Sequence, residues 1–109
     1  MIDCKDFENR IKNFLKVKKF LEAEQKIQAG LDKFPNQLNL LVIATEVYRA
    51  LGDSKKSLSY SEILLIHYPG NPIGYIRKIH NFLDLAFKNL LFSLLFYLNH
   101  LYSKICNLY

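Results

Sequence analysis

The chain has 109 residues, of which 50% are hydrophobic and 23% charged, with a formal net charge of +5. This size predicts one globular domain that buries roughly two-thirds of the surface of its unfolded chain. The two cysteines, Cys4 and Cys106, lie far apart without CxxC or His-rich spacing, which argues against a metal site and a disulfide-built secreted scaffold. The acidic start "MIDCKDFENR" lacks the order of a signal peptide, so we expect a cytoplasmic protein.

The positive charge is concentrated in the first part of the chain. Residues 1–80 hold 13 Lys and Arg against 9 acids, and residues 81–109 hold 2 against 1. The densest cluster is Lys16, Lys18 and Lys19, but the acids Glu22 and Glu24 follow at once. We therefore interpret the cluster as a solvated helix end and do not expect a nucleic-acid partner.

The first two-thirds of the chain predict four helices, at 3–17, 19–33, 37–51 and 54–67. Apolar residues there recur at helical spacings of three and four, as in Leu38, Leu41, Val42 and Thr45. Gly52 can end one helix, Asp53 or Ser54 can cap the next, and "YPGNP" cannot continue a helix. Short turns between amphipathic helices predict antiparallel helical hairpins.

The sequence repeats its pattern at a fixed shift of 34 residues, which we call the period. This shift places Pro35 on Pro69. The same shift aligns Leu31 with Leu65, Phe34 with Tyr68, Phe7 with Leu41 and Tyr75, and Phe14 with Tyr48 and Phe82. A constant period of this length is typical of a helical repeat array, in which each hairpin covers the apolar face of its neighbour.

These positions resemble the tetratricopeptide repeat family. The second unit fits best, and in the first unit Arg10 and Ile11 replace the family's Leu-Gly pair. In the third unit Lys78, Leu91 and Ser103 depart from the pattern. The matching residues are Leu41, Ala44, Thr45, Tyr48, Gly52, Ser57 and Pro69 in the second unit, and Phe7, Phe14, Ala23, Ile27 and Pro35 in the first.

The resemblance implies an all-α, right-handed superhelical stack of antiparallel hairpins with about two and a half repeats. The repeat domain is expected over 3–82, with units at 4–37 and 38–71 and a third unit starting at 72. Residues 83–109 form an apolar terminal helix, a degenerate third repeat or an atypical ending.

Residues 81–109, "NFLDLAFKNLLFSLLFYLNHLYSKICNLY", have charges only at Asp84, Lys88 and Lys104, so their apolar side chains need a cover. We expect a helix packed partly on the array and partly on a second copy or another protein. Membrane attachment and a chain that is cut short or frame-shifted after about His80 remain alternatives. The uncharged run at 89–103 is shorter than the roughly 20 residues of a membrane span. The predicted oligomer or membrane contacts are Leu91, Leu94, Leu95, Tyr97 and Leu98.

The sequence does not predict an enzyme. His67, His80 and His100 are scattered, no phosphate-binding glycine motif occurs, and we expect no cofactor and no metal site. The resemblance implies a concave partner-binding groove lined by the first helix of each unit. The groove residues are Asn9, Lys12, Lys16, Asn39, Ile43, Glu46, Arg49, Arg77 and His80.

This basic and apolar groove suits a protein or peptide with acidic and apolar groups. The carboxylate clamp of some family members is not expected, because of its positions only Arg77 carries the family's residue. We therefore predict a non-catalytic interaction or scaffold module. Two alternatives stay open: the helical front end of a larger bacterial transferase or polysaccharide-processing enzyme, and a small membrane-associated protein anchored by its terminal helix at the inner face of a membrane.

Overall fold

The computed structural model describes residues 4–107 and is all-helical over that range. The five helices are α1 (Cys4–Lys16), α2 (Phe20–Lys33), α3 (Leu38–Ala50), α4 (Ser54–His67) and α5 (Ile73–Asn107). The predicted all-α class is confirmed, and the bounds of the first four helices agree with the predicted ones to within one residue. The predicted first helical residue, Asp3, and residues 108–109 of the predicted terminal segment lie outside the described residues.

The period of the sequence is also present in the backbone. Helices α1 and α3 start and end one period apart, and so do α2 and α4. Equivalent backbone bonds close the two hairpins: Phe34 N donates to Gly30 O, and Tyr68 N donates to Leu64 O, both at 2.8 Å. The two units therefore share their local structure as well as their apolar pattern.

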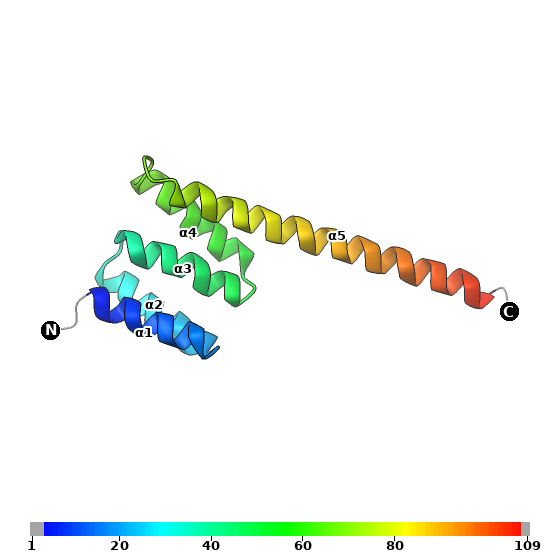
Figure 1. The fold of residues 1–109 in the computed structure, drawn as a ribbon, viewed down its shortest axis with the longest axis horizontal. Coiled ribbons are helices and arrows are strands. Elements are labelled where there is room, and N and C mark those ends of the chain that lie inside the picture. Colours follow the sequence, from blue (N-terminus) through cyan, green and yellow to red (C-terminus); the bar gives the residue numbers. More distant parts are fainter. Residues whose placement is uncertain (1–3, 108–109) are drawn as a thin grey trace.

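Consecutive helices run in alternating directions and pack against one another (Figure 1). Contacts also join α1 to α3 and α3 to α5, so the first helices of successive units lie side by side. The molecule measures 71 × 31 × 18 Å, because α5 continues far beyond the four other helices as a single rod (Figure 1). We call the body formed by residues 4–84 the helical array.

The core is centred on α3, which packs against α1, α2, α4 and the start of α5. Burial of these side chains from water is the main stabilising term of the array. The buried hydrophobic residues are Phe7, Ile11, Ala23, Ile27, Leu31, Leu40, Leu41, Ile43, Ala44, Val47, Tyr48 and Leu64.

Helix α5 docks on α4 through a close backbone approach and a polar contact. Gly74 is buried, and a Cβ atom there would lie 3.0 Å from Leu65 Cδ2 and 3.2 Å from Leu65 N. About two helical turns further along α5, the buried Asn81 donates a hydrogen bond from Nδ2 to Ser61 Oγ at 3.1 Å. Apart from Gly74 and Asn81, no described residue of α5 is buried, so the docking is confined to its first part.

A third hairpin does not form within residues 4–107, because the turn chemistry of the second unit is lost. In that unit Gly52 adopts a left-handed φ of +79°, and the Asp53 side chain accepts from Lys56 N at 3.1 Å. The residues one period further on are Ala86 and Phe87, which provide neither a left-handed turn nor a cap. The helix therefore continues through this point as α5.

The first unit makes the same turn with an unfavourable residue. Lys18, one period before Gly52, has a φ of +62°. A non-glycine residue in the left-handed region costs roughly 1–2 kcal/mol. We expect Gly52→Ala to lower the free energy of unfolding by about 1 kcal/mol and Lys18→Gly to leave it equal or raise it by up to about 1 kcal/mol. Urea unfolding followed by circular dichroism measures both changes; a clear loss with Lys18→Gly would contradict the turn geometry.

Candidate functional site

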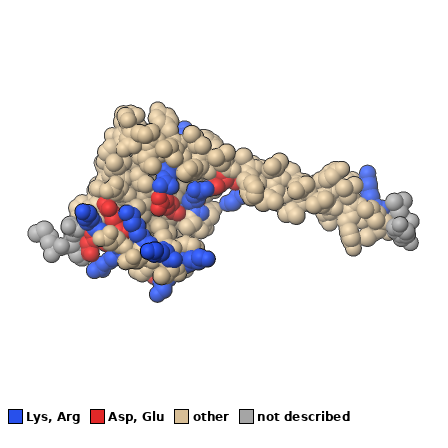
Figure 2. Space-filling model, viewed as in Figure 1, with Lys and Arg blue, Asp and Glu red and all other residues tan. Residues whose placement is uncertain are grey.

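The helices α1, α3 and the first part of α5 together form one continuous face of the array. Figure 2 shows this face, with Lys and Arg residues gathered over its lower part, acidic residues near its centre, and a distal α5 that is almost free of charge. The predicted groove residues all belong to these three helices. The face is therefore the place where a partner-binding site has to be sought.

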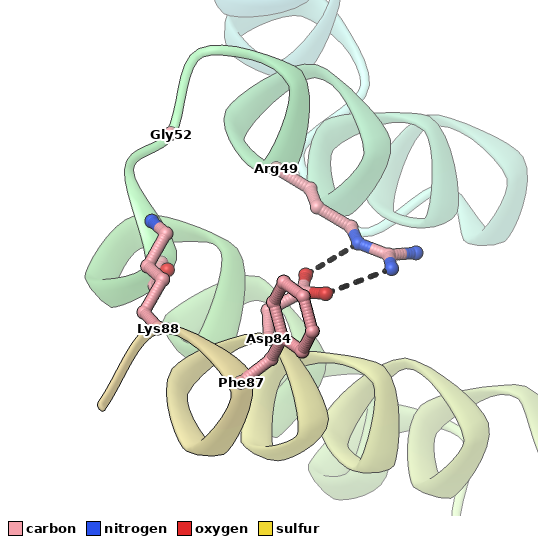
Figure 3. Close-up of a pocket in the computed structure, with 6 residues that line it drawn as sticks. Arg49, Gly52, Asp84, Phe87 and Lys88 are labelled. Carbon is pink, nitrogen blue, oxygen red and sulfur yellow. Dashed lines mark hydrogen bonds and ion pairs between the residues drawn. The ribbon is translucent and has the colours of Figure 1, made fainter. Parts of the chain in front are cut away.

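Two ion pairs join α3 to α5 across this face. Arg77 Nη2 lies 2.6 Å from Glu46 Oε1. Arg49 binds Asp84 through two bonds, with Nε 2.5 Å from Oδ2 and Nη2 3.0 Å from Oδ1 (Figure 3). Such forked pairing fixes the guanidinium plane against the carboxylate. These pairs hold α5 against α3 and also neutralise most of the charge at the centre of the face.

The Arg49–Asp84 pair is charged over the physiological pH range. The hydrogen bond from Arg49 lowers the pKa of Asp84 below its usual value, and the same bond raises the pKa of Arg49. The two side chains are 44% and 30% exposed, so water and salt screen their attraction. The pair contributes no more than about 1 kcal/mol to stability, and its main effect is to set the direction of α5.

A hollow of about 480 Å³ lies between α1 and α3, and we call it the basic hollow. Its lining residues are Lys12, Asn13, Leu15, Lys16 and Glu46. Both lysines are exposed and form no ion pair within residues 4–107, while the Glu46 carboxylate is held by Arg77. The basic hollow therefore offers two ammonium groups beside the half-buried Leu15, an arrangement that suits a carboxylate with an apolar neighbour.

A second hollow, of about 320 Å³, lies where α5 leaves the hairpin of α3 and α4. Figure 3 shows Lys88 extending from α5 toward the Gly52 turn, and Asp84 turned toward Arg49. Both carboxylate oxygens of Asp84 are already bonded to that arginine. The lining residues are Arg49, Gly52, Ser54, Asp84, Phe87 and Lys88.

Some predicted groove residues lie outside both hollows. Asn9 and Asn39 are exposed, but they line neither hollow. Ile43 is 4% exposed, so its side chain belongs to the core and offers no surface to a partner; its place in the predicted groove is corrected. Helix α3 packs against α1, α2, α4 and α5. Position 43, which would face the groove in the resembled family, therefore lies in the core of this protein.

The α5 members of the predicted groove are half-buried. Arg77 Nε and His80 Nδ1 are buried and have no hydrogen-bond partner among the described residues. Arg77 is committed to Glu46, so its charge is not available to attract a ligand in the way that Lys12 and Lys16 are. The positive character of the face therefore depends on α1.

Sequence reasoning missed seven residues that line the two hollows. They are Asn13 and Leu15 in the basic hollow, and Gly52, Ser54, Asp84, Phe87 and Lys88 in the second hollow. Asp84 is the sole acid of residues 81–109, and that isolation was a signal that it needs a basic partner. Its partner Arg49 lies 35 residues earlier, a separation that helical periodicity does not predict. Leu15 carries no signal, since a half-buried leucine at the end of a helix is common.

The second part of α5 does not pack on the array as expected. Every residue from 85 to 107 is exposed, including the predicted contact residues. Their exposed fractions are 42% for Leu91, 52% for Leu94, 61% for Leu95, 58% for Tyr97 and 50% for Leu98. By length and composition alone, α5 could also cross a membrane, with a mean hydropathy of 1.3 and 6% burial in its most apolar window.

Comparisons of the chain with protein-family models, with curated proteins and with solved structures found no match. Within residues 4–107, no three His, Cys, Asp or Glu side chains gather where they could hold a metal ion.

Proposed function

We propose that this chain is a non-catalytic interaction module that binds a partner protein in the basic hollow between α1 and α3. The observation that carries the proposal is the placement of Lys12 and Lys16 beside Leu15, with no ion pair within the described residues to neutralise either lysine. The resemblance of the repeating units to tetratricopeptide repeats favours the same face. We place this binding in the cytoplasm.

The chemistry of the hollow selects the partner. Two ammonium groups about one helical turn apart favour a segment with Asp or Glu side chains, and Leu15 favours an apolar anchor between them. The acidic residue of the hollow does not oppose this binding, because Glu46 is paired with Arg77. The expected ligand is an acidic segment with Leu or Phe, in extended or helical form.

We expect Lys12→Gln combined with Lys16→Gln to weaken binding of such a segment about tenfold, which corresponds to about 1.4 kcal/mol. The probe is a short fluorescein-labelled peptide that alternates Leu or Phe with Asp or Glu, and binding is measured by fluorescence polarisation. Glutamine keeps the helix propensity of lysine, so α1 should remain folded.

The matched control is Lys19→Gln with Lys55→Gln, which removes the same charge from exposed positions outside the face. It should leave the affinity unchanged apart from a small long-range effect. A second control peptide, with Asn and Gln in place of the acids, should bind weakly to every variant. An equal loss of peptide affinity in the two double variants would contradict the proposal. Equal binding of the acidic and the control peptide by the wild-type chain would contradict it as well.

A further inference from the structure

The distal part of α5, residues 85–107, presents more apolar surface than a monomer leaves in water. All its residues are exposed, and the helix continues without interruption to Asn107. Soluble monomers rarely expose contiguous apolar patches larger than a few hundred Å². A cover for this segment has to come from outside the chain described so far.

The apolar residues of this segment follow a heptad pattern. Six of them are separated alternately by four and three residues, the spacing that places side chains along one line of a helix. We call this line the apolar seam. It consists of Phe87, Leu91, Leu94, Leu98, Leu101 and Ile105.

The side of the helix opposite the seam is mainly polar. Leu85, Phe92 and Phe96 are apolar exceptions on this side, and we call the line of polar residues along it the polar stripe. A helix immersed in lipid has no need of such a stripe, whereas a helix that packs on one side and faces water on the other does. The polar stripe consists of Asn89, Ser93, His100, Ser103 and Asn107.

The length of the uncharged run also favours a protein cover over a bilayer. The run from Asn89 to Ser103 has 15 residues, which is about 22 Å of helix against a hydrocarbon core of about 30 Å. The seam itself, from Phe87 to Ile105, extends beyond this run and is bordered by Lys88 and Lys104. A coiled-coil contact tolerates these lysines at its edge, where their charged ends reach water.

We propose that the cover is a second copy of this chain, paired antiparallel along the apolar seam. In this register Leu94 packs against Leu98 of the second copy, Leu91 against its Leu101 and Phe87 against its Ile105. The six seam residues have no charge, so two identical seams do not repel each other. The contact is self-complementary, as a two-fold symmetric interface requires.

The antiparallel direction follows from the position of the array. The array lies at the N-terminal end of the exposed segment (Figure 1). Antiparallel pairing overlaps residues 85–107 completely while the two arrays lie at opposite ends. Parallel pairing would instead bring together two arrays that each have a sequence charge of +4 over residues 1–80, from 13 basic and 9 acidic residues.

This pairing goes beyond binding in the basic hollow, and it does not depend on it. The dimer contains two basic hollows, so it can bind a partner that has two acidic segments. The flanking residues Leu90, Leu95, Tyr97 and Tyr102 are apolar too, so pairs can associate further into a four-helix bundle. The expected assembly is therefore a dimer or an even multiple of it.

The test is light scattering coupled to size-exclusion chromatography of the full chain without detergent. The expected molar mass is an even multiple of 12.8 kDa. Leu94→Lys with Leu98→Lys puts charges into the seam and should give a monomer. The matched control, Ser93→Lys with His100→Lys, puts the same charges into the polar stripe and should leave the assembly intact.

Three outcomes would overturn the pairing. The first is a monomeric or polydisperse wild-type chain, and the second is equal dissociation of the seam and stripe variants. The third is flotation of the wild-type chain with phosphatidylcholine vesicles that both variants reduce equally, since a bilayer disfavours a lysine on either side of the helix. A urea transition of the seam variant shows that its array is folded, so a monomer there reports lost pairing.

Cross-linking with a short bismaleimide tests the direction. In a background with Cys4→Ser and Cys106→Ser, Leu95→Cys lies next to its own copy at the centre of an antiparallel pair and should cross-link. Ile105→Cys should not, because the two copies of this position are about 27 Å apart along the pair. Cross-linking of Ile105→Cys would establish a parallel pair, in which each residue lies level with its own copy, and would overturn the proposed register.

Discussion

Replacement of Tyr48 by alanine is expected to destabilise the array by about 3–5 kcal/mol, the range for truncation of a buried aromatic side chain. Tyr48 is 1% exposed, and its ring stacks on Tyr60 of α4 with centroids 5.5 Å apart. Its hydroxyl accepts a hydrogen bond from Gln28 Nε2 of α2. The side chain therefore joins three helices of both hairpins, and a domain with a total stability of roughly 5–15 kcal/mol would lose much of it.

Urea unfolding followed by circular dichroism measures this loss, and Tyr48→Phe is the matched control. Phenylalanine keeps the ring stacking and removes the acceptor for Gln28, whose amide is then left with Tyr60 Oη at 3.4 Å. The expected cost is about 1 kcal/mol. Burial raises the pKa of Tyr48, so the phenol is neutral at physiological pH and no lost charge adds to the effect. A cost for Tyr48→Ala no larger than that for Tyr48→Phe would contradict the central packing role.

Gly74→Ala is expected to push the first part of α5 a few tenths of an ångström away from α4. It should lower stability by about 1–3 kcal/mol, in spite of the better helix propensity of alanine. The new Cβ atom would lie 3.0 Å from Leu65 Cδ2 and 3.2 Å from Leu65 N. The side chain of Leu65 can rotate away, but its backbone nitrogen cannot. The strain therefore has to be relieved by a shift of the whole helix.

Hydrogen exchange locates this effect, because amide protection should fall over residues 75–84 and persist in α1 and α2. The control is Gly70→Ala in the loop before α5, where no heavy atom lies within 4 Å of the added Cβ. Gly70 has no positive φ, so alanine there should leave stability equal or raise it by less than about 1 kcal/mol. A larger loss at Gly70 than at Gly74 would argue against the close approach of α4 and α5.

If both proposals hold, the two parts of the chain have separate tasks. The array presents the basic hollow, and the distal part of α5 brings two arrays together. Because the seam begins at Phe87, beyond the Arg49–Asp84 pair, the docking of α5 on the array and its pairing with a second copy use different residues. Variants in the seam and in the hollow can therefore be combined to separate avidity from the affinity of a single hollow.

Local signals in the sequence determined the helices and their period. Gly52, Asp53 and the prolines around Gly70 act on their own neighbours, and the apolar spacing acts within one or two helical turns, so the first four helices could be predicted to within one residue. The absence of a third turn also has a local cause, because Ala86 and Phe87 stand where the second unit has Gly52 and Asp53. Of the site, the exposed position of Lys12 and Lys16 on a first helix could be predicted in the same way.

Contacts between hairpins were decided only by the tertiary structure. The burial of Ile43 and the pairing of Arg49 with Asp84 depend on how neighbouring units cross, and the paired residues are 35 positions apart. Helical periodicity fixes which residues share a face of one helix, but it does not fix which faces meet. That choice is made by the packing of whole helices, where close approach at Gly74 and burial around α3 outweigh the preferences of any single residue.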